Sequence, residues 1–184
     1  MASDPDGLQA ARDQWLWRGA DLPPFAQKPQ QGQVSVWSFP RPPQLVRDTR
    51  EVIVRWGGTL VAQSKCCVLV LETSHPPSFY IPWADVTSQL LVNAQGTSMC
   101  EWKGPAKYWS LVDGERSLAH VAWSYPSPFD SAQALADCVA FYPAHLHCTV
   151  DGARVQPQPG GFYGGWITPE LVGPFKGEPG TSGW

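Results

Sequence analysis

The chain has 184 residues, a length typical of one domain, and it is rich in Trp (10), Pro (19) and Gly (17). This composition excludes a helical bundle and is typical of short strands joined by turns. The net charge of −3, with Lys and Arg scattered along the chain, argues against an extended surface for a nucleic-acid polymer. No run approaches the ~18 apolar residues of a membrane span.

Residues 1–32 are predicted to form an N-terminal arm. A weakly helical piece over residues 8–17 precedes Pro23-Pro24 and a Gln-rich stretch, and such a composition buries little surface alone. We therefore expect the arm to be partly disordered or packed on the domain, and residues 33–184 to form a β domain. Its first predicted strand, residues 33–39, stops at Pro40-Arg41-Pro42-Pro43 because proline lacks an amide donor, and an extended linker follows.

The middle of the chain predicts an antiparallel meander. Gly57-Gly58 separates two β-rich runs and suits the positive φ angles of a two-residue hairpin turn. The nearly continuous apolar run over residues 66–72 predicts a strand buried on both faces. Further strands are predicted over residues 78–81, 89–93, 98–102, 106–112 and 116–123, with a short helical turn over 82–86 and turns at Gly96, Gly104-Pro105 and Asp113-Gly114.

One short helix and a wrapping tail complete the prediction. Asp130 suits the N-cap of a helix over residues 131–141, which has an apolar face. A last strand is predicted over residues 146–150. From Gln156 onward the tail is rich in Gly, Pro and aromatic residues, so we expect it to wrap on the domain and to bury Phe162, Trp166 and Phe175. The predicted fold class is a compact, mainly β, antiparallel and barrel-like domain.

The cysteine pattern bears on the compartment. Five cysteines, an odd number with Cys66 and Cys67 adjacent, do not make a disulfide framework, so a reduced compartment is the simpler interpretation. Asp4 and Asp6 stand where a signal peptide would carry basic and apolar residues. We therefore expect a cytoplasmic protein.

Two runs of the sequence, residues 71–82 and 100–109, place ionisable side chains between aromatic and proline residues. Polar groups held in apolar surroundings are where pKa values and hydrogen bonds become chemically useful. We expect the two runs to form two walls of one pocket.

These runs also carry a family resemblance. The chain resembles the DUF427 family, also described as nucleotidyltransferase-like. The matching runs are Glu72-Thr73-Ser74-His75-Pro76-Pro77, Tyr80-Ile81-Pro82, Cys100-Glu101-Trp102-Lys103-Gly104, Tyr108-Trp109-Ser110 and Ala122-Trp123-Ser124-Tyr125-Pro126. Segments around residues 35–43 and 161–184 are also similar to longer members, so the resemblance spans about residues 33–184. It implies a mainly β domain similar to the β-tent, or Mss4-like, folds, and it implies no settled activity.

Glu72 and Lys103 are the first candidate catalytic pair. Glu72 follows an apolar strand, where burial raises a carboxyl pKa unless a cation compensates. If both side chains point inward, Glu72 is a candidate general base and Lys103 an electrostatic clamp or a nucleophile, because burial lowers a lysine pKa. A buried ion pair that ties two strands together explains the same residues equally well.

His75 and Cys100 are the other two catalytic candidates. His75 precedes two prolines on a rigid turn, which suits proton transfer, although a hydrogen-bonding strut is the interpretation we favour. Cys100 has Lys103 and His75 as cations that would stabilise a thiolate, and a buried, inert thiol is the commoner state of an isolated cysteine.

Aromatic side chains supply the candidate ligand-binding residues. Tyr80 can donate its hydroxyl to a ligand, or it can be an ordinary core aromatic residue. Strand alternation can aim several further rings into one cage for a flat or cationic ligand, whereas large aromatic residues also fill β cores. The candidates are Tyr80, Trp102, Tyr108, Trp123 and Tyr125.

Metal and cofactor sites are not predicted. The chain has no CxxC motif, whereas several β-tent folds carry zinc on paired CxxC knuckles. His145, His147 and Cys148 are treated as a surface feature. The Gly-rich tail lacks the Gly-Lys-Ser/Thr order of a phosphate-binding loop.

The function predicted from the sequence is recognition of a small polar or planar molecule, with acid–base or covalent turnover by Glu72 and Lys103 as an extension. One alternative is a noncatalytic ligand-binding or adaptor module. Another is nucleotidyl transfer, which needs paired carboxylates for Mg²⁺, and the sequence offers only isolated acids such as Glu72, Asp85 and Glu101. The oligomeric state is left open.

Overall fold

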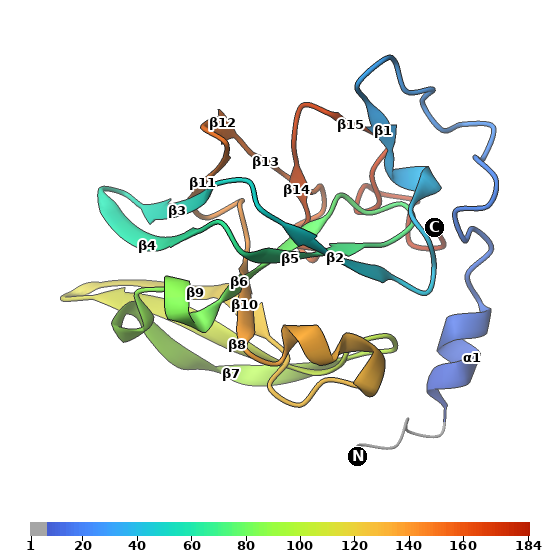
Figure 1. Ribbon diagram of the computed structural model, residues 1–184. Helices are drawn as coiled ribbons and strands as arrows, with labels where there is room; N and C mark the ends of the chain where they lie inside the picture. The colour runs from blue at the N-terminus through green and yellow to red at the C-terminus, as the bar shows by residue number, and fades with distance from the viewer. Residues whose placement is uncertain (1–6) are drawn as a thin grey trace.

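A computed structural model describes residues 7–184, and its largest element is a seven-stranded antiparallel sheet (Figure 1). The strand order in this sheet is β2-β5-β6-β10-β9-β8-β7. The strands are β2 (Gln44–Asp48), β5 (Cys67–Leu71), β6 (Ser78–Pro82), β7 (Leu91–Cys100), β8 (Gly104–Asp113), β9 (Arg116–Ser124) and β10 (Cys138–Phe141).

A four-stranded sheet of order β12-β11-β3-β4 packs beside the large sheet. It comprises β3 (Val52–Trp56), β4 (Thr59–Ser64), β11 (His147–Val150) and β12 (Ala153–Arg154). Two small pairs join the ends of the chain to this body: β1 (Val34–Ser35) runs parallel to β15 (Leu171–Val172), and β13 (Gln156–Pro157) runs antiparallel to β14 (Trp166–Ile167). Among the described residues the sheets do not close into a barrel, so the expected barrel-like closure is wrong.

Side-chain alternation along β5 and β6 separates the main core from the candidate site. Leu69, Phe79 and Ile81 join the core between the two sheets, where Val52, Val54 and Val61 also lie. Val70 and Tyr80 point to the opposite face and join a second cluster with Trp123 and Tyr125. The strand predicted to be buried on both faces is therefore confirmed, and its second face carries the site.

The local turn chemistry predicted from the sequence is largely confirmed. The Gly57-Gly58 hairpin joins β3 to β4, and Gly57 has the expected positive φ of 58°. A 3-10 turn over Trp83–Asp85 follows β6, as expected. Gly96 does not end a strand, however: it lies within β7, where the pairing with β8 shifts register between Asn93 and Thr97.

The helix predicted over residues 131–141 is wrong. Residues Asp130–Leu135 form 3-10 turns that are interrupted at Ala132, and the next residues form β10. β10 lies between β6 and β9 in the large sheet, and all four of its residues are buried. The apolar residues of β10 are compatible with a strand buried on both faces and also with the apolar face of a helix. The segment forms a strand because it pairs with β6 along one edge and with β9 along the other.

Three further differences concern the ends of the domain. The predicted strand over residues 33–39 is only β1, followed by a 3-10 turn over Val36–Ser38, and the expected linker contains β2. In the tail, Trp166 is fully buried as predicted, Phe175 is partly buried, and Phe162 is 70% exposed, contrary to the prediction.

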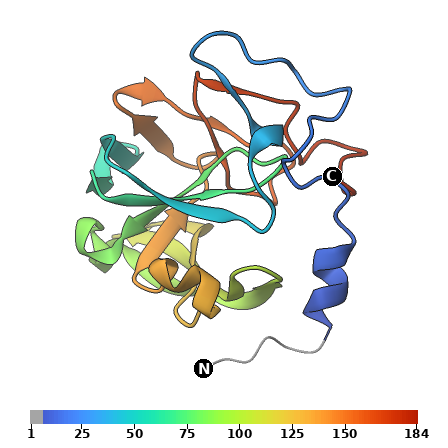
Figure 2. The ribbon, with the colours of Figure 1, turned by 45° about the vertical axis from the view of Figure 1, so that its right-hand side comes forward.

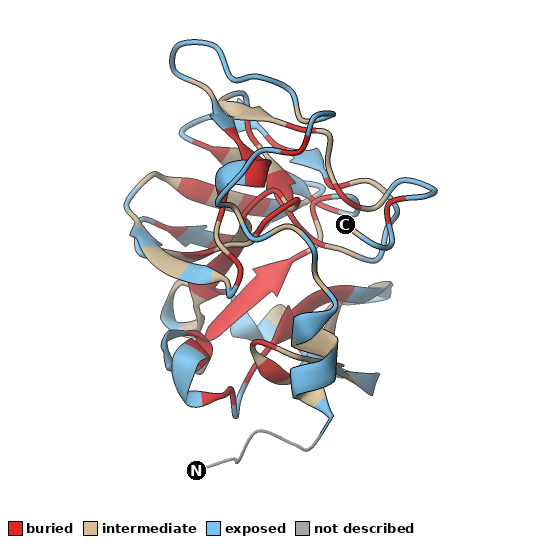
Figure 3. Cartoon of the chain, turned by 90° about the vertical axis from the view of Figure 1, so that its right-hand side faces the viewer, coloured by how far each residue is buried: buried red, intermediate tan, exposed pale blue. Residues whose placement is uncertain are grey.

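The N-terminal segment runs along one side of the domain, beside the C-terminal tail (Figures 1 and 2). Its α-helix, α1 (Leu8–Asp13), has no buried residue, and Figure 3 shows it at the surface. The segment is attached at several points: Nε of Arg12 donates to the carbonyl of Glu101, Phe25 stacks on Trp184, and the amide of Gln27 donates to the carbonyl of Gly173. The part of the predicted arm formed by residues 1–6 lies outside the described residues.

Candidate functional site

The two runs expected to be walls of one pocket lie on either side of a single hollow with a volume of about 230 Å³. Residues from β5, β6, the β7–β8 hairpin and β9 line it together with residues of the N-terminal segment and the tail. The lining includes eight of the nine predicted site residues: Glu72, His75, Tyr80, Cys100, Lys103, Tyr108, Trp123 and Tyr125. The eight residues that were grouped from the sequence therefore line one hollow in the structure.

Glu72 lies in the tight turn that follows β5. The amide of His75 donates to the carbonyl of Glu72 and closes this turn, in which Ser74 has a φ of 72°. The carboxylate has cations on two sides: Lys103 Nζ lies 3.5 Å from Oε2, and Arg41 Nε lies 3.4 Å from Oε1. Burial alone would raise the pKa of Glu72, but Lys103, His75 and Arg41 outweigh it and hold that pKa below its usual value.

Lys103 lies in the turn between β7 and β8, with its side chain only 12% exposed. Burial opposes its charge, but the neighbouring Cys100 and Glu72 raise the pKa of the ammonium group above its ordinary value. The expectation of a lowered pKa for Lys103 is therefore wrong, because Cys100 and Glu72 outweigh the effect of burial. Lys103 stands as a protonated cation, which suits an electrostatic clamp and does not suit a nucleophile.

His75 is held in place by a side chain that the sequence analysis did not single out. The amide nitrogen Nε2 of Gln158 lies 2.9 Å from Nδ1 of His75, and the same nitrogen donates to the carbonyl of Lys176. Burial, together with the cations nearby, lowers the pKa of His75 to about 4. A neutral imidazole fixed in this way fits the hydrogen-bonding strut that we favoured.

One end of the hollow is aromatic. Trp123 Nε1 donates to the Tyr80 hydroxyl over 3.0 Å, and the Trp123 ring also packs against Tyr142 with a centroid separation of 4.6 Å. Tyr125 lies beside Tyr80, and burial raises the pKa of both phenols. Tyr108 pairs its hydroxyl with Ser98 Oγ at 2.8 Å. This end thus presents ring faces and neutral hydroxyl groups.

Trp102 is the one predicted ligand-binding residue that does not line the hollow. Its side chain is buried, Nε1 has no hydrogen-bond partner, and the guanidinium carbon of Arg12 lies 5.1 Å from its ring centroid. Trp102 lies in the same tight turn as Lys103, so its side chain packs under the N-terminal segment while Lys103 faces the hollow.

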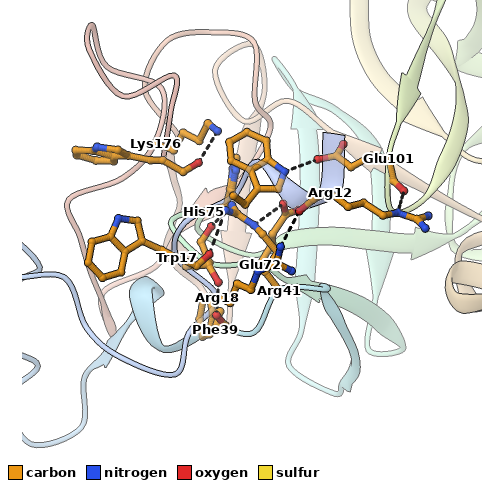
Figure 4. A network of polar contacts seen from close by, with 12 residues as sticks. Arg12, Trp17, Arg18, Phe39, Arg41, Glu72, His75, Glu101 and Lys176 are labelled. Atoms are coloured by element: carbon orange, nitrogen blue, oxygen red, sulfur yellow. Dashed lines mark hydrogen bonds and ion pairs between the residues drawn. The ribbon is translucent and has the colours of Figure 1, made fainter. Parts of the chain in front are cut away.

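The other end of the hollow is charged, and distant segments build it. Trp15 and Lys176 line this end, and Arg41 lies behind it. Arg41 also donates through Nη2 to the carbonyl of Thr73 over 2.8 Å, which fixes its guanidinium beside Glu72. Figure 4 shows this network, with Arg41 and Glu72 at its centre, Arg12 and Glu101 on one side and Lys176 on the other.

Few features of the sequence point to Arg41, Trp15, Gln158 and Lys176 as residues of this site. Arg41 stands in a Pro-Arg-Pro-Pro run, where a lone cation on a rigid linker was the available signal. Trp15, Gln158 and Lys176 lie in segments expected to be an arm or a tail, and only the tertiary fold brings them to residues 72 and 103.

Two general features complete the description. Among residues 7–184 no helix is long and apolar enough to cross a membrane. In the same range no three His, Cys, Asp or Glu side chains gather in a group that would hold a metal ion.

The fold and site define a mainly β domain in which a buried carboxylate between two cations faces an aromatic-lined hollow. A family model described as a domain of unknown function (DUF427) matches residues 44–155, well over half of the chain. The chain therefore belongs to the DUF427 family. The match is shorter than the span of residues 33–184 that the resemblance suggested, because it omits the N-terminal segment and most of the tail. No curated protein matches the chain.

Proposed function

We propose that this protein binds a small polar molecule that carries a planar group, in the hollow between residues 71–82 and 100–109. The observation that carries the proposal is the pair of Glu72 and Lys103, at 3.5 Å and with side chains only 14% and 12% exposed, in the wall of a hollow that aromatic residues also line. Charged groups cost free energy to bury, and a site that holds them beside stacking surfaces is suited to orient a ligand.

The chemistry of the two ends indicates how a ligand would lie. Tyr80, Tyr125 and Trp123 line the end of the hollow that would receive the planar part. Lys103 offers N–H donors to an oxygen of the ligand, and Glu72 offers acceptors to a donor beside it. A compact ligand with a ring at one end and adjacent donor and acceptor groups at the other satisfies both ends.

The protonation states favour binding over turnover. The pKa of Glu72 is held low by Lys103, His75 and Arg41 against the effect of burial, so its carboxylate is a weak proton acceptor. The pKa of Lys103 is held high by Cys100 and Glu72, so its amine is a weak nucleophile. We therefore place noncatalytic recognition first and catalysis by this pair second.

We also propose a β-tent arrangement for the two antiparallel sheets, on the strength of the family resemblance.

The proposal is tested with the full chain in a native mass spectrum of freshly purified protein, followed by thermal shift with benzamide, nicotinate and adenine as probes. We expect a bound organic mass or a probe-dependent rise in Tm. Lys103→Met should abolish either signal, because it removes the clamp and leaves Glu72 paired with Arg41.

The matched control is Glu51→Gln, which breaks the exposed pair with Lys65 at 3.7 Å, far from the hollow. This variant should bind as the wild type does. Equal binding by Lys103→Met and wild type, or a chain that carries no adduct and responds to none of the probes, would contradict the proposal. New product masses on incubation with a bound probe would show turnover.

A further inference from the structure

The indole ring of Trp15 lies in the mouth of the hollow, surrounded by charged groups from three other segments. Its Nε1 donates to Glu101 Oε1 over 3.0 Å. The ammonium nitrogen of Lys176 lies 3.9 Å from the ring centroid, and the guanidinium carbon of Arg41 lies 4.6 Å from it. One flat ring therefore satisfies an anion through its N–H group and two cations through its π system.

These three charged groups belong to the domain, and Arg41 is also tied to the N-terminal segment, because its Nη1 donates to the carbonyl of Trp17 over 3.3 Å. Glu101 belongs to the β7–β8 turn. Lys176 is 1% exposed, and its Nζ donates to the carbonyl of Trp184 over 2.6 Å. The side chain of Arg41 is fully buried and bonded to Thr73. These bonds of Lys176 and Arg41 do not involve residues 8–16, so both cations keep them when Trp15 leaves the recess between the three charged groups.

The segment that delivers Trp15 is weakly built. α1 has six residues and no buried residue, and its N-cap Gly7 makes no side-chain capping bond. Leu16, the next residue after Trp15, is 76% exposed. A helix of this length has little stability of its own, so residues 8–16 are held mainly by the contacts of Trp15 and by Arg12, whose Nε donates to the carbonyl of Glu101 over 2.8 Å.

We propose that Trp15 acts as an internal ligand, and that a small heteroaromatic molecule bearing an N–H group takes its place against Glu101, Lys176 and Arg41 when residues 8–16 move away. This inference rests on the proposed function, since the same molecule would extend from this recess toward Glu72 and Lys103. Cation–π contact selects an electron-rich ring, and Glu101 selects a ring with a donor. The N-terminal segment then competes with the ligand.

The test uses 5-fluoroindole and the full chain, with binding followed by fluorine NMR. Trp15→Ala empties the recess and should bind 5-fluoroindole at least about tenfold more tightly than the wild type, because the competing ring is gone. The matched control is Leu16→Ala, which changes an exposed neighbour on the same segment. It should bind no more tightly than the wild type.

A second ligand separates specific recognition from simple filling of a cavity. 5-Fluoro-1-methylindole has no N–H donor and should bind Trp15→Ala about tenfold more weakly than 5-fluoroindole, as expected for loss of a hydrogen bond to a charged acceptor. Adding Glu101→Gln to Trp15→Ala should reduce this discrimination. Equal binding of the two indoles, or no binding of 5-fluoroindole to a folded Trp15→Ala chain, overturns the proposal.

Trp15→Phe covers the case in which Trp15→Ala does not fold, because it keeps a ring and removes only the N–H donor. The Phe ring should occupy the recess less stably than the Trp15 ring, so Trp15→Phe should bind 5-fluoroindole more tightly than the wild type does. An affinity for 5-fluoroindole equal to that of the wild type overturns the proposal. If N-acetyltryptophanamide binds Trp15→Ala and 5-fluoroindole does not, the recess receives a peptide side chain and the proposal is wrong as stated. Loss of probe binding in Lys103→Met bears on the proposed function and leaves this result untouched.

Discussion

Glu72 and Lys103 meet across the wall of the hollow, with the carboxylate Oε2 3.5 Å from the ammonium Nζ and Arg41 on the other side of the carboxylate. Glu72→Gln would leave two buried cations without their counter-ion. We expect it to lower the free energy of unfolding by about 3 kcal/mol, measured by urea denaturation. Glu51→Gln, in the exposed pair with Lys65, should cost less than about 1 kcal/mol. Equal losses in the two variants would show that the Glu72 pair contributes no more than a surface ion pair.

Tyr80 accepts a hydrogen bond from Trp123 inside the aromatic end of the hollow. Tyr80→Phe leaves the buried indole N–H without an acceptor, so we expect a loss of about 2 kcal/mol in stability. Tyr108→Phe is the matched control. It removes the hydrogen bond between the Tyr108 hydroxyl and Ser98 Oγ, but Ser98 is partly exposed and can bond to water instead, so the loss of stability should be less than about 1 kcal/mol. Chemical denaturation of both variants decides the point, and a larger loss for Tyr108→Phe would contradict it.

The stability of the protein should depend on pH through His75. Burial lowers the pKa of His75 to about 4 in the folded chain, below the ordinary 6.5. Between these two values the unfolded chain binds more protons than the folded chain, so stability falls as the pH falls from 6.5 toward 4 and is fully present above 6.5. The loss should be on the order of 2 kcal/mol.

His75→Gln should remove most of this pH dependence above pH 4.5, while the exposed His147→Gln should preserve it. Below 4.5 Glu72 adds a loss of its own, because Lys103, His75 and Arg41 hold its pKa low against the effect of burial. Urea midpoints measured across this range test the prediction. A wild-type profile that is flat from 6.5 to 4.5 would contradict it.

Gly164 supports the aromatic end from the tail. A Cβ atom at this position would overlap the outer atoms of the Trp123 ring. Gly164→Ala should therefore push Trp123 into the hollow and reduce ligand binding at least about tenfold, with a smaller effect on Tm. Gly183→Ala is the control, because a Cβ there meets no atom within 4 Å. Titration of both variants with a probe that binds the wild type gives the answer, and unchanged binding by Gly164→Ala would count against the placement of the ligand beside Trp123.

Much of the fold could be predicted because it depends on local signals. The Gly57-Gly58 hairpin, the two-faced β5 and the turn after β6 each follow from the backbone preferences of a few residues. β10 was mistaken for a helix because its apolar residues suit either structure, and only its two neighbouring strands distinguish them. The strand β2 was missed because it pairs only at one edge of the sheet and follows a proline-rich run.

The site divides in the same way. Runs that alternate ionisable and aromatic residues brought out Glu72, Lys103 and their neighbours, since both walls lie within one part of the chain. Arg41, Trp15 and Lys176 could not be found by such a pattern. Each is an ordinary residue of its own segment, and it gains its role only through contacts with segments far away in the sequence.

The family match ends at residue 155, whereas Trp15, Gln158, Tyr163 and Lys176 all contribute to the mouth of the hollow from outside it. The residues of the hollow that belong to the large sheet thus lie within the family match, whereas the residues at its rim (Trp15, Gln158, Tyr163 and Lys176) lie in the two terminal stretches of the chain. Under the proposed function, substitutions at these rim residues would change which molecule the hollow admits, while the sheet and the pair of Glu72 and Lys103 would stay intact. The terminal stretches are not free to vary throughout, because Trp166 of the tail is fully buried in the main core.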